Sequence, residues 1–504
     1  MRDDQLQSFR IAASNGMAFT ALGQGLKLFV HMAAIVLLSR LLGPSNFGIF
    51  AMLSPILALA TILRDAGVNG AILQRSTVSY EELSTLFWLH VSWGCVLAVI
   101  LGLSAPFIAL FYAEPRLIPL VIASTFIVVA GSLSLQHMAL LNRDLRFRAL
   151  AFIDAGSLAL GYVVGTITAL LTGSYWALVA AAGTTTVTVV VSSWAVCRWR
   201  PGWPSTPNNV SDILRVGGNI TLSGLFDFLI RSVDNVLIGR ARGPFELGLY
   251  DRAYRIVLLP LVFVSAPMDR LVLPLLVRMR NEQERYRKIY RLAVQAPLLA
   301  ILPSMVTIMA IPEPVCLLLL GPEWKQAAPL LGWLSLAGAL QLVTSSLGAL
   351  LISQERAREL TLLNAFSFVF ACAAYAIGLP YGAWGVAACY AVSEVIRAPL
   401  AVYWTTRRGW VRPSDIAEAV LPFVAAGVSA FAAISLLKHQ LPGAPVTLIG
   451  LSAFISYAIT LALLACTRSG RQCLNEASDV AERFRTFLWS PDGGGWLRRQ
   501  VSRR

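Results

Sequence analysis

The chain has 504 residues, and its composition does not fit a soluble protein of that length. Hydrophobic residues make up 57% and charged residues only 13%, whereas soluble domains carry about 25% charged residues. So few polar residues could not cover the surface of several soluble domains, and the same numbers exclude intrinsic disorder. The sequence therefore predicts an all-α polytopic membrane protein.

The formal net charge is +14, from 41 Lys and Arg against 27 Asp and Glu. A nucleic-acid-binding protein would gather this excess on a water-exposed domain, and the sequence contains no candidate for one. The positive-inside rule explains the charge better, because Lys and Arg favour cytoplasmic loops. The seven cysteines show no Cys-x-x-Cys spacing, so neither a zinc site nor a disulfide framework is supported.

Windows of about 20 apolar residues predict fourteen membrane spans. They are 16–39, 46–63, 84–111, 117–140, 149–172, 175–197, 216–239, 248–268, 290–311, 327–352, 361–379, 383–404, 417–437 and 445–466. Basic residues gather in alternate connections, which predicts that both termini are cytoplasmic. The external connections are about a dozen residues at most, too short to hold a catalytic domain.

An internal repeat relates the two halves of the chain. RLLGPSNFGIF at 40–50 matches RARGPFELGLY at 240–250, with Arg, Gly, Pro and Gly at the same offsets. Spans one to six therefore correspond to spans seven to twelve in the same orientation, a plan found in transporters. The expected organisation is an N-terminal lobe, a C-terminal lobe, two further spans and a basic tail. Their predicted bounds are 1–210, 211–412, 413–470 and 471–504.

The first span carries a polar stripe. Gln24, Lys27 and His31 follow one another at spacings of three and four, so they share one face of a helix. Ionisable residues at membrane depth are costly and point to a functional site. Lys27 has no acidic partner in its own span, which favours a role in binding substrate.

The seventh span carries the equivalent stripe, formed by Asp227, Arg231 and Asp234. The offset of 200 aligns Asp227 with residue 27 and Arg231 with residue 31. We therefore expect two polar faces at equal depth, lining a substrate cavity. The alternative is structural, because Arg231 could pair with the acidic residues one turn away on either side.

Three further charged residues are candidates for a secondary cavity or gate: Arg255, Glu394 and Arg397. Glu394 and Arg397 are three residues apart and could equally neutralise each other. Trp324 lies near a span end, as do several other tryptophans, which is typical of the aromatic belt at a membrane surface. The sequence has no phosphate-binding Gly-rich loop and no metal-ligand spacing, so it predicts no cofactor. Any energy for transport would come from an H⁺ or Na⁺ gradient or from the membrane potential.

Five segments carry a resemblance to a known family. They are LSRLLGPSNFG at 38–48, ELSTLFW at 82–88, NRDLRFR at 142–148, and VDNVLIG at 233–239 with GLYDRAYR at 248–255. The chain resembles the polysaccharide-biosynthesis flippases, which are O-antigen and exopolysaccharide translocases of the multidrug/oligosaccharidyl-lipid/polysaccharide exporter superfamily.

The resemblance implies a bacterial inner-membrane protein with two six-helix lobes that is a transporter and not an enzyme. It implies alternating access that moves a polyprenyl-diphosphate-linked oligosaccharide to the outer leaflet. The implied partners are this lipid-linked oligosaccharide, membrane lipids and other polysaccharide assembly proteins. Lys27, His31 and Arg231 would attract the diphosphate, whereas Asp227 and Asp234 would offset Arg231 and could serve ion coupling.

Two other functions stay open. A cation-coupled multidrug antiporter of the same fold would ordinarily need an acidic site in its first two spans, where only the peripheral Asp65 is found. A membrane enzyme of glycan assembly would need a catalytic constellation, and the sequence has none that we recognise.

Overall fold

The structure is a computed structural model that describes residues 25–65, 79–144, 146–204, 210–440, 445–467, 469–476 and 478. Helices dominate these residues, and none of them lies in a β-strand. The prediction of an all-α protein is confirmed. Within the described part of the chain, ten helical stretches are long and apolar enough to cross a membrane.

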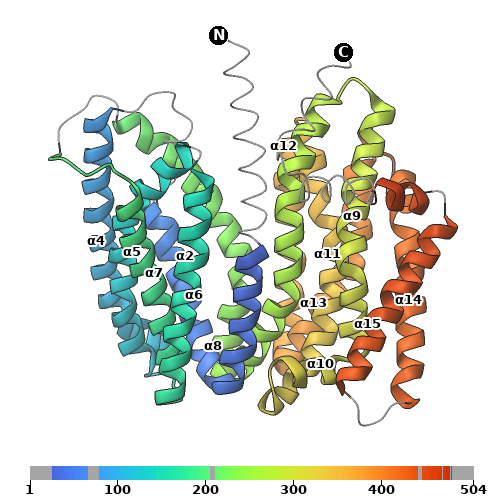
Figure 1. Ribbon diagram of the computed structural model, residues 1–504, viewed down its shortest axis with the longest axis horizontal. Helices are drawn as coiled ribbons and strands as arrows, with labels where there is room; N and C mark the ends of the chain where they lie inside the picture. The colour runs from blue at the N-terminus through green and yellow to red at the C-terminus, as the bar shows by residue number, and fades with distance from the viewer. Residues whose placement is uncertain are drawn as a thin grey trace, which may run out of the picture. The chain divides into compact units, whose positions relative to one another are not determined.

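The first compact unit comprises residues up to Arg252 together with Leu319–Trp324 and Leu379–Ala383. Its helices are residues 25–41, α2 (Pro44–Asp65), α4 (Tyr80–Tyr112), α5 (Leu117–Arg143), α6 (Phe147–Thr172), α7 (Trp176–Val196) and the first part of α8 (Val210–Arg278). Among these, α2, α4, α5, α6 and α7 pack side by side (Figure 1).

The second unit contains the rest of α8 and the following helices. These are α9 (Gln283–Ala310), α10 (Pro312–Leu319), α11 (Ala328–Ser353), α12 (Ala357–Gly378), α13 (Gly382–Thr406), α14 (Pro413–Gln440) and α15 (Pro445–Cys466). Of the two short 3₁₀ turns, Leu379–Tyr381 belongs to the first unit and Pro322–Ala327 begins in it. Helix α9 packs against α11, α14 and α15, so the two C-terminal helices contact the core of this unit. The predicted bounds of the lobes stay a prediction.

Within the described residues, the predicted spans coincide with helices, and local sequence explains several of their ends. Ser79 caps α4 through a capping box, in which Glu82 N–H donates to Ser79 Oγ and Ser79 N–H donates to the Glu82 carboxylate. Spans seven and eight lie in the two helical legs of α8, which meet at Gly243, where the backbone is not helical. Its φ of +79° is a conformation that glycine adopts without strain, so the chain turns there between two helical legs.

The repeated segments meet each other inside the first unit, at a contact that we call the paired corner, residues 43–48 and 243–248. A Cβ built on Gly48 would overlap the Pro244 carbonyl, and one on Gly248 would overlap the Pro44 carbonyl. The two glycines therefore let the starts of two equivalent helices touch backbone to backbone. The sequence repeat is thus also a symmetric packing contact in three dimensions.

Two hydrogen bonds extend this symmetry. Asn46 Nδ2 donates to the Gly173 carbonyl at 3.3 Å, and the equivalent Glu246 carboxylate accepts from Ala383 N–H at 2.7 Å. Each bond ties the start of a repeated helix to the place where the fifth and sixth helices of its own repeat join: Gly173 follows α6, and Ala383 is near the start of α13. The correspondence therefore covers helices well beyond the matching sequence segments.

Trp324 is not a membrane-belt residue, contrary to the sequence prediction. Its side chain is completely buried at the paired corner, and its Nε1–H donates to the Ser39 carbonyl at 2.8 Å. Its ring lies 5.5 Å from that of Phe47, and the Arg252 guanidinium lies 3.9 Å from the centre of the Phe47 ring. A position near a span end is compatible with either a lipid-facing belt or a buried corner, and here packing decides for the corner.

Candidate functional site

Lys27 and His31 lie on the helix of residues 25–41, in its more exposed first half. The spacing of four places them one turn apart on a common face, as their sequence pattern predicts. The second half of this helix is buried at Ala34, Ile35 and Leu38, where it approaches the paired corner. Gln24, the third member of the predicted stripe, lies outside the described residues.

Both side chains contact α6, the fifth predicted span. Lys27 Nζ lies 3.5 Å from Asp154 Oδ2, and the Tyr162 hydroxyl lies 2.8 Å from His31 Nδ1. The imidazole and phenol rings meet edge to face, with centres 5.6 Å apart. Together these four residues form a polar face between the two helices, which we call the Lys27 face.

Sequence reasoning missed both partners on α6. Asp154 is the one charged residue in the predicted span 149–172, a signal of the same kind as the one that pointed to Lys27. Tyr162 gave no comparable signal, because tyrosine is common in apolar helices. Lys27 lacks an acidic partner in its own helix, but a neighbouring helix supplies one.

The stripe on the seventh span is described only at Asp234. This carboxylate is buried: its Oδ2 accepts from the Tyr250 hydroxyl at 3.0 Å, and its Oδ1 accepts from Asn235 N–H at 2.8 Å. The side chains of Asp227 and Arg231 lie outside the described residues, so their predicted pairing stays a prediction. Arg255 is half-buried further along α8.

Glu394 and Arg397 form a buried, two-pronged ion pair within α13, one of the two arrangements that their spacing allows. The Arg397 Nε–Oε1 distance is 3.0 Å, and Nη2 lies 2.5 Å from Oε2. The guanidinium also donates to Ser367 Oγ on α12 at 2.9 Å and to Thr344 Oγ1 on α11 at 3.4 Å. This arginine therefore links three helices of the second unit, and its donors are engaged by protein groups.

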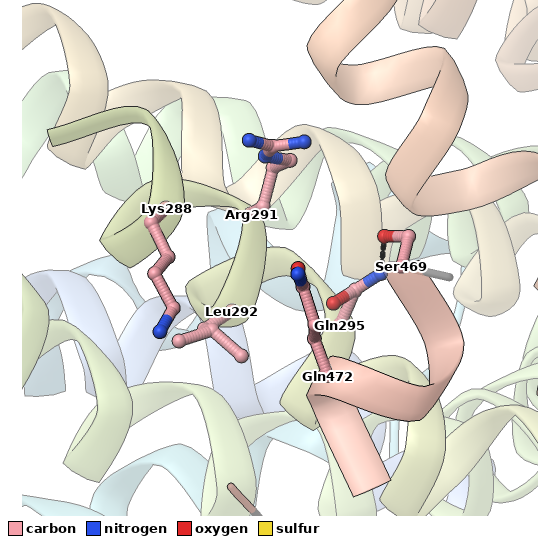
Figure 2. Close-up of a pocket in the computed structure, with 6 residues that line it drawn as sticks. All are labelled: Lys288, Arg291, Leu292, Gln295, Ser469 and Gln472. Carbon is pink, nitrogen blue, oxygen red and sulfur yellow. Dashed lines mark hydrogen bonds between the residues drawn. The ribbon is translucent and has the colours of Figure 1, made fainter. Parts of the chain in front are cut away.

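A polar pocket lies in the first half of α9 in the second unit (Figure 2). Its lining consists of Lys288, Arg291, Leu292, Gln295, Ser469 and Gln472. Its two cations are both paired with carboxylates, at 2.7 Å for Lys288 with Glu476 and 3.2 Å for Arg291 with Glu418. At its floor, Gln295 Nε2 donates to Ser469 Oγ at 2.8 Å. The contacts of Glu476 and Ser469 fasten the segment after α15 to α9, and that of Glu418 joins α14 to α9.

The Lys27 face is a better candidate for binding a charged substrate than the ion pair of Arg397 with Glu394. The side chains of Lys27 and Asp154 are 37% and 41% exposed, whereas those of Arg397 and Glu394 are 10% and 4% exposed. An exposed ammonium binds oxyanions, and imidazole and phenol groups hydrogen-bond to hydroxyls. No group of three or more His, Cys, Asp or Glu side chains in the described residues could hold a metal ion.

The connection between α4 and α5 contributes a charged pair outside the membrane-spanning helices. Arg116 Nε donates to Glu114 Oε1 at 2.7 Å, and this guanidinium holds the pKa of the Glu114 carboxyl below its ordinary value. Close by in the same unit, the Arg240 guanidinium lies 5.9 Å from the centre of the Phe111 ring. The end of α4 therefore contacts the helix that leads into the second half of the paired corner.

Curated relatives include several proteins of bacterial polysaccharide synthesis. The chain is 24% identical over 403 residues to the lipopolysaccharide biosynthesis protein WzxC of Escherichia coli, covering 79% of this chain and 81% of that protein. It is 27% identical to the teichuronic acid biosynthesis protein TuaB of Bacillus subtilis, covering 59% and 62%. The succinoglycan biosynthesis transport protein ExoT of Rhizobium meliloti is 24% identical, covering 61% and 62%.

Solved structures establish the fold. The lipid II flippase MurJ in an inward closed conformation aligns with a TM-score of 0.71 at 14% identity, over 88% of this chain and 97% of that one. An inward-facing multidrug resistance transporter of the MATE family aligns at 0.59 with 19% identity, over 76% and 94%. The fold is therefore the two-lobe fold that these membrane proteins share, as the repeat predicted.

The family model described as polysaccharide biosynthesis protein matches residues 37–329, which is more than half of the chain. All of the segments that carried the sequence resemblance lie inside this match, together with α6 and its Asp154 and Tyr162. The chain is a multi-pass membrane protein that belongs to the polysaccharide biosynthesis protein family.

Proposed function

We propose that this protein flips a polyprenyl-diphosphate-linked oligosaccharide from the cytoplasmic to the outer leaflet of a bacterial inner membrane. The observation that carries the proposal is the Lys27 face: a half-exposed ammonium paired with a carboxylate, next to an imidazole and a phenol, between two predicted membrane helices. Family membership supports the proposal, as do relatives named for lipopolysaccharide and succinoglycan synthesis and a solved neighbour named a lipid II flippase.

The physical task matches this chemistry. A diphosphate and its sugars cannot enter hydrocarbon without losing their hydration, at a cost of many kcal/mol for the charged group. Lys27 would compensate the negative charge, His31 and Tyr162 would hydrogen-bond to polar groups, and the polyprenyl tail would stay in lipid. The protein would act as a transporter, with binding and release as its chemistry.

Alternating access would require the two repeats to separate and close at opposite ends. In the orientation expected from the loop charges, both termini are cytoplasmic and the paired corner lies at the outer surface. The two glycines would then allow tight closure there while the Lys27 face is reached from the cytoplasm. An H⁺ or Na⁺ gradient or the membrane potential would drive the cycle, with Asp227 and Asp234 as candidates for an ion-binding role.

The test is a leaflet assay in the host. The gene is deleted together with any redundant translocase, and lipid-linked oligosaccharide is measured by its accessibility in intact spheroplasts. We expect completed units to accumulate on the inner face and wild-type protein to restore their delivery. Lys27→Ala with Arg231→Ala should fail to restore it at equal protein level, whereas Lys438→Ala, which removes an exposed positive charge on α14, should restore it.

Normal outward delivery in the deletion strain would contradict this function. A drug-efflux assay would then test the cation-coupled multidrug antiporter, which has the MATE-like fold in its favour. Elongation or ligation of lipid-linked sugar by the purified protein would instead support a membrane enzyme.

A further inference from the structure

The Lys27–Asp154 pair is built to exchange partners. Its 3.5 Å separation exceeds the 2.7–2.9 Å of a charge-assisted hydrogen bond, and both side chains are more than one-third exposed. An exposed ion pair contributes only about 0–1 kcal/mol to stability. The buried pair of Arg397 with Glu394 contrasts with it in every respect, since it is two-pronged, close and further bonded to two hydroxyls.

Asp154 and a diphosphate would compete for the same group. A carboxylate and a phosphate both present negatively charged oxygens to the ammonium of Lys27. Only one of the two can form a close ion pair with it at a time. When the diphosphate binds, the carboxylate is left beside it and repels it, which lowers affinity. When the substrate leaves, the carboxylate again neutralises Lys27, so the empty site never holds an isolated ammonium at membrane depth.

The contact between Tyr162 and His31 keeps the helices of Lys27 and Asp154 side by side. The Tyr162 hydroxyl and His31 Nδ1 are 2.8 Å apart, and they join the same two helices one turn further along the helix of Lys27. This bond can persist while the ammonium of Lys27 changes partner, because it involves neither of the two charged groups. Lys27 and Asp154 would therefore separate by side-chain rotation, without the helices moving apart.

We propose that Asp154 is a positioning residue that holds Lys27 in the empty protein and gives it up to the diphosphate of the substrate. The proposal rests on the proposed function, because it assumes that Lys27 binds this diphosphate. Asp154 weakens binding of the diphosphate and so speeds its release. A carrier that bound its lipid-linked cargo too tightly would complete the first half of its cycle and stall.

The experiment compares binding with translocation. Purified full-length protein in lipid nanodiscs is titrated with farnesyl diphosphate, and the leaflet assay is run on the same variants. Asp154→Asn should bind the probe about tenfold more tightly and deliver lipid-linked oligosaccharide several-fold more slowly. Asp154→Glu should restore both values towards wild type. Glu81→Gln, which removes an exposed negative charge at the start of α4, should match wild type in both.

Two outcomes separate the competition from the proposed function. Equal affinity for the probe in wild type and Asp154→Asn, or weaker binding in the variant, would overturn the competition. Asp154→Ser gives a second removal of the charge if the asparagine variant does not fold, and the same criteria apply to it. A wild-type protein that neither binds the probe nor delivers lipid-linked oligosaccharide would instead refute the proposed function.

Discussion

The two ends of the helix at residues 25–41 are built in different ways. Its first half carries Lys27 and His31, which are partly exposed and contact Asp154 and Tyr162 of α6. Its second half runs into the paired corner, where glycines and prolines of two repeats touch and Trp324 is completely buried. One end relies on close backbone packing and the other on exchangeable polar contacts. Stability and function are therefore expected to respond to changes at opposite ends of one helix.

Gly48 should show the largest effect on stability. A Cβ at this position would overlap the Pro244 carbonyl, which is backbone and cannot rotate away. Gly48→Ala should lower the free energy of unfolding by more than about 4 kcal/mol, or prevent folding, because the two helix starts must separate. Denaturant unfolding in mixed micelles measures this change.

Gly183→Ala is the matched control. No atom outside its own helix lies within 4 Å of a Cβ built there, so the variant should gain roughly 0.5–1 kcal/mol from improved helix propensity. Equal stability of the Gly48 and Gly183 variants would mean that the paired corner is not tightly closed.

Arg397 should come next, because its loss leaves a buried carboxylate without its partner. Arg397→Met should cost about 3–5 kcal/mol, since Glu394 would remain in a site where it is only 4% exposed. The double variant Glu394→Leu with Arg397→Met should recover most of this cost. The free energies of unfolding of the two single variants and the double variant give the coupling energy between Glu394 and Arg397. Strictly additive costs would argue against an ion pair that stabilises the packing of α11, α12 and α13.

Trp324 tests the corner with a smaller change. Trp324→Phe removes the Nε1–H that donates to the Ser39 carbonyl and leaves a gap beside Phe47. The expected loss is about 1–3 kcal/mol in the free energy of unfolding. Trp203→Phe is the control, because that side chain is 91% exposed and its replacement should change stability by less than about 0.5 kcal/mol. Equal losses of unfolding free energy in the two variants would mean that Trp324 behaves as a surface aromatic residue.

These comparisons also explain which features the sequence could reveal. Apolar windows located the helices, because lipid demands about 20 apolar residues at each crossing. The repeat of Gly43, Pro44 and Gly48 at an offset of 200 marked the paired corner, although it did not reveal that the two copies touch. Periodicity on one helix carries no information about which neighbour packs against it.

To predict the partners of the polar residues, one would need to know which helices are neighbours. The offset of 200 compares equivalent positions in two repeats, so it linked Lys27 to Asp227 and not to Asp154 on a neighbouring helix of the same repeat. Trp324 was misassigned for a related reason, since its distance from a span end says nothing about which segment covers it. By contrast, the ion pair of Glu394 and Arg397 was foreseeable, because both residues lie on one helix three residues apart.

Lys27 should show the smallest effect on stability and one of the largest on transport. Lys27→Met removes a half-exposed ion pair, so the free energy of unfolding should change by less than about 1 kcal/mol. The same variant should lose delivery of lipid-linked oligosaccharide, while Lys27→Arg should keep much of it because it retains the cation. If Lys27→Met instead loses as much free energy of unfolding as Trp324→Phe, the ion pair holds the helix in place. The contrast between an end that packs closely and an end that binds substrate would then be wrong.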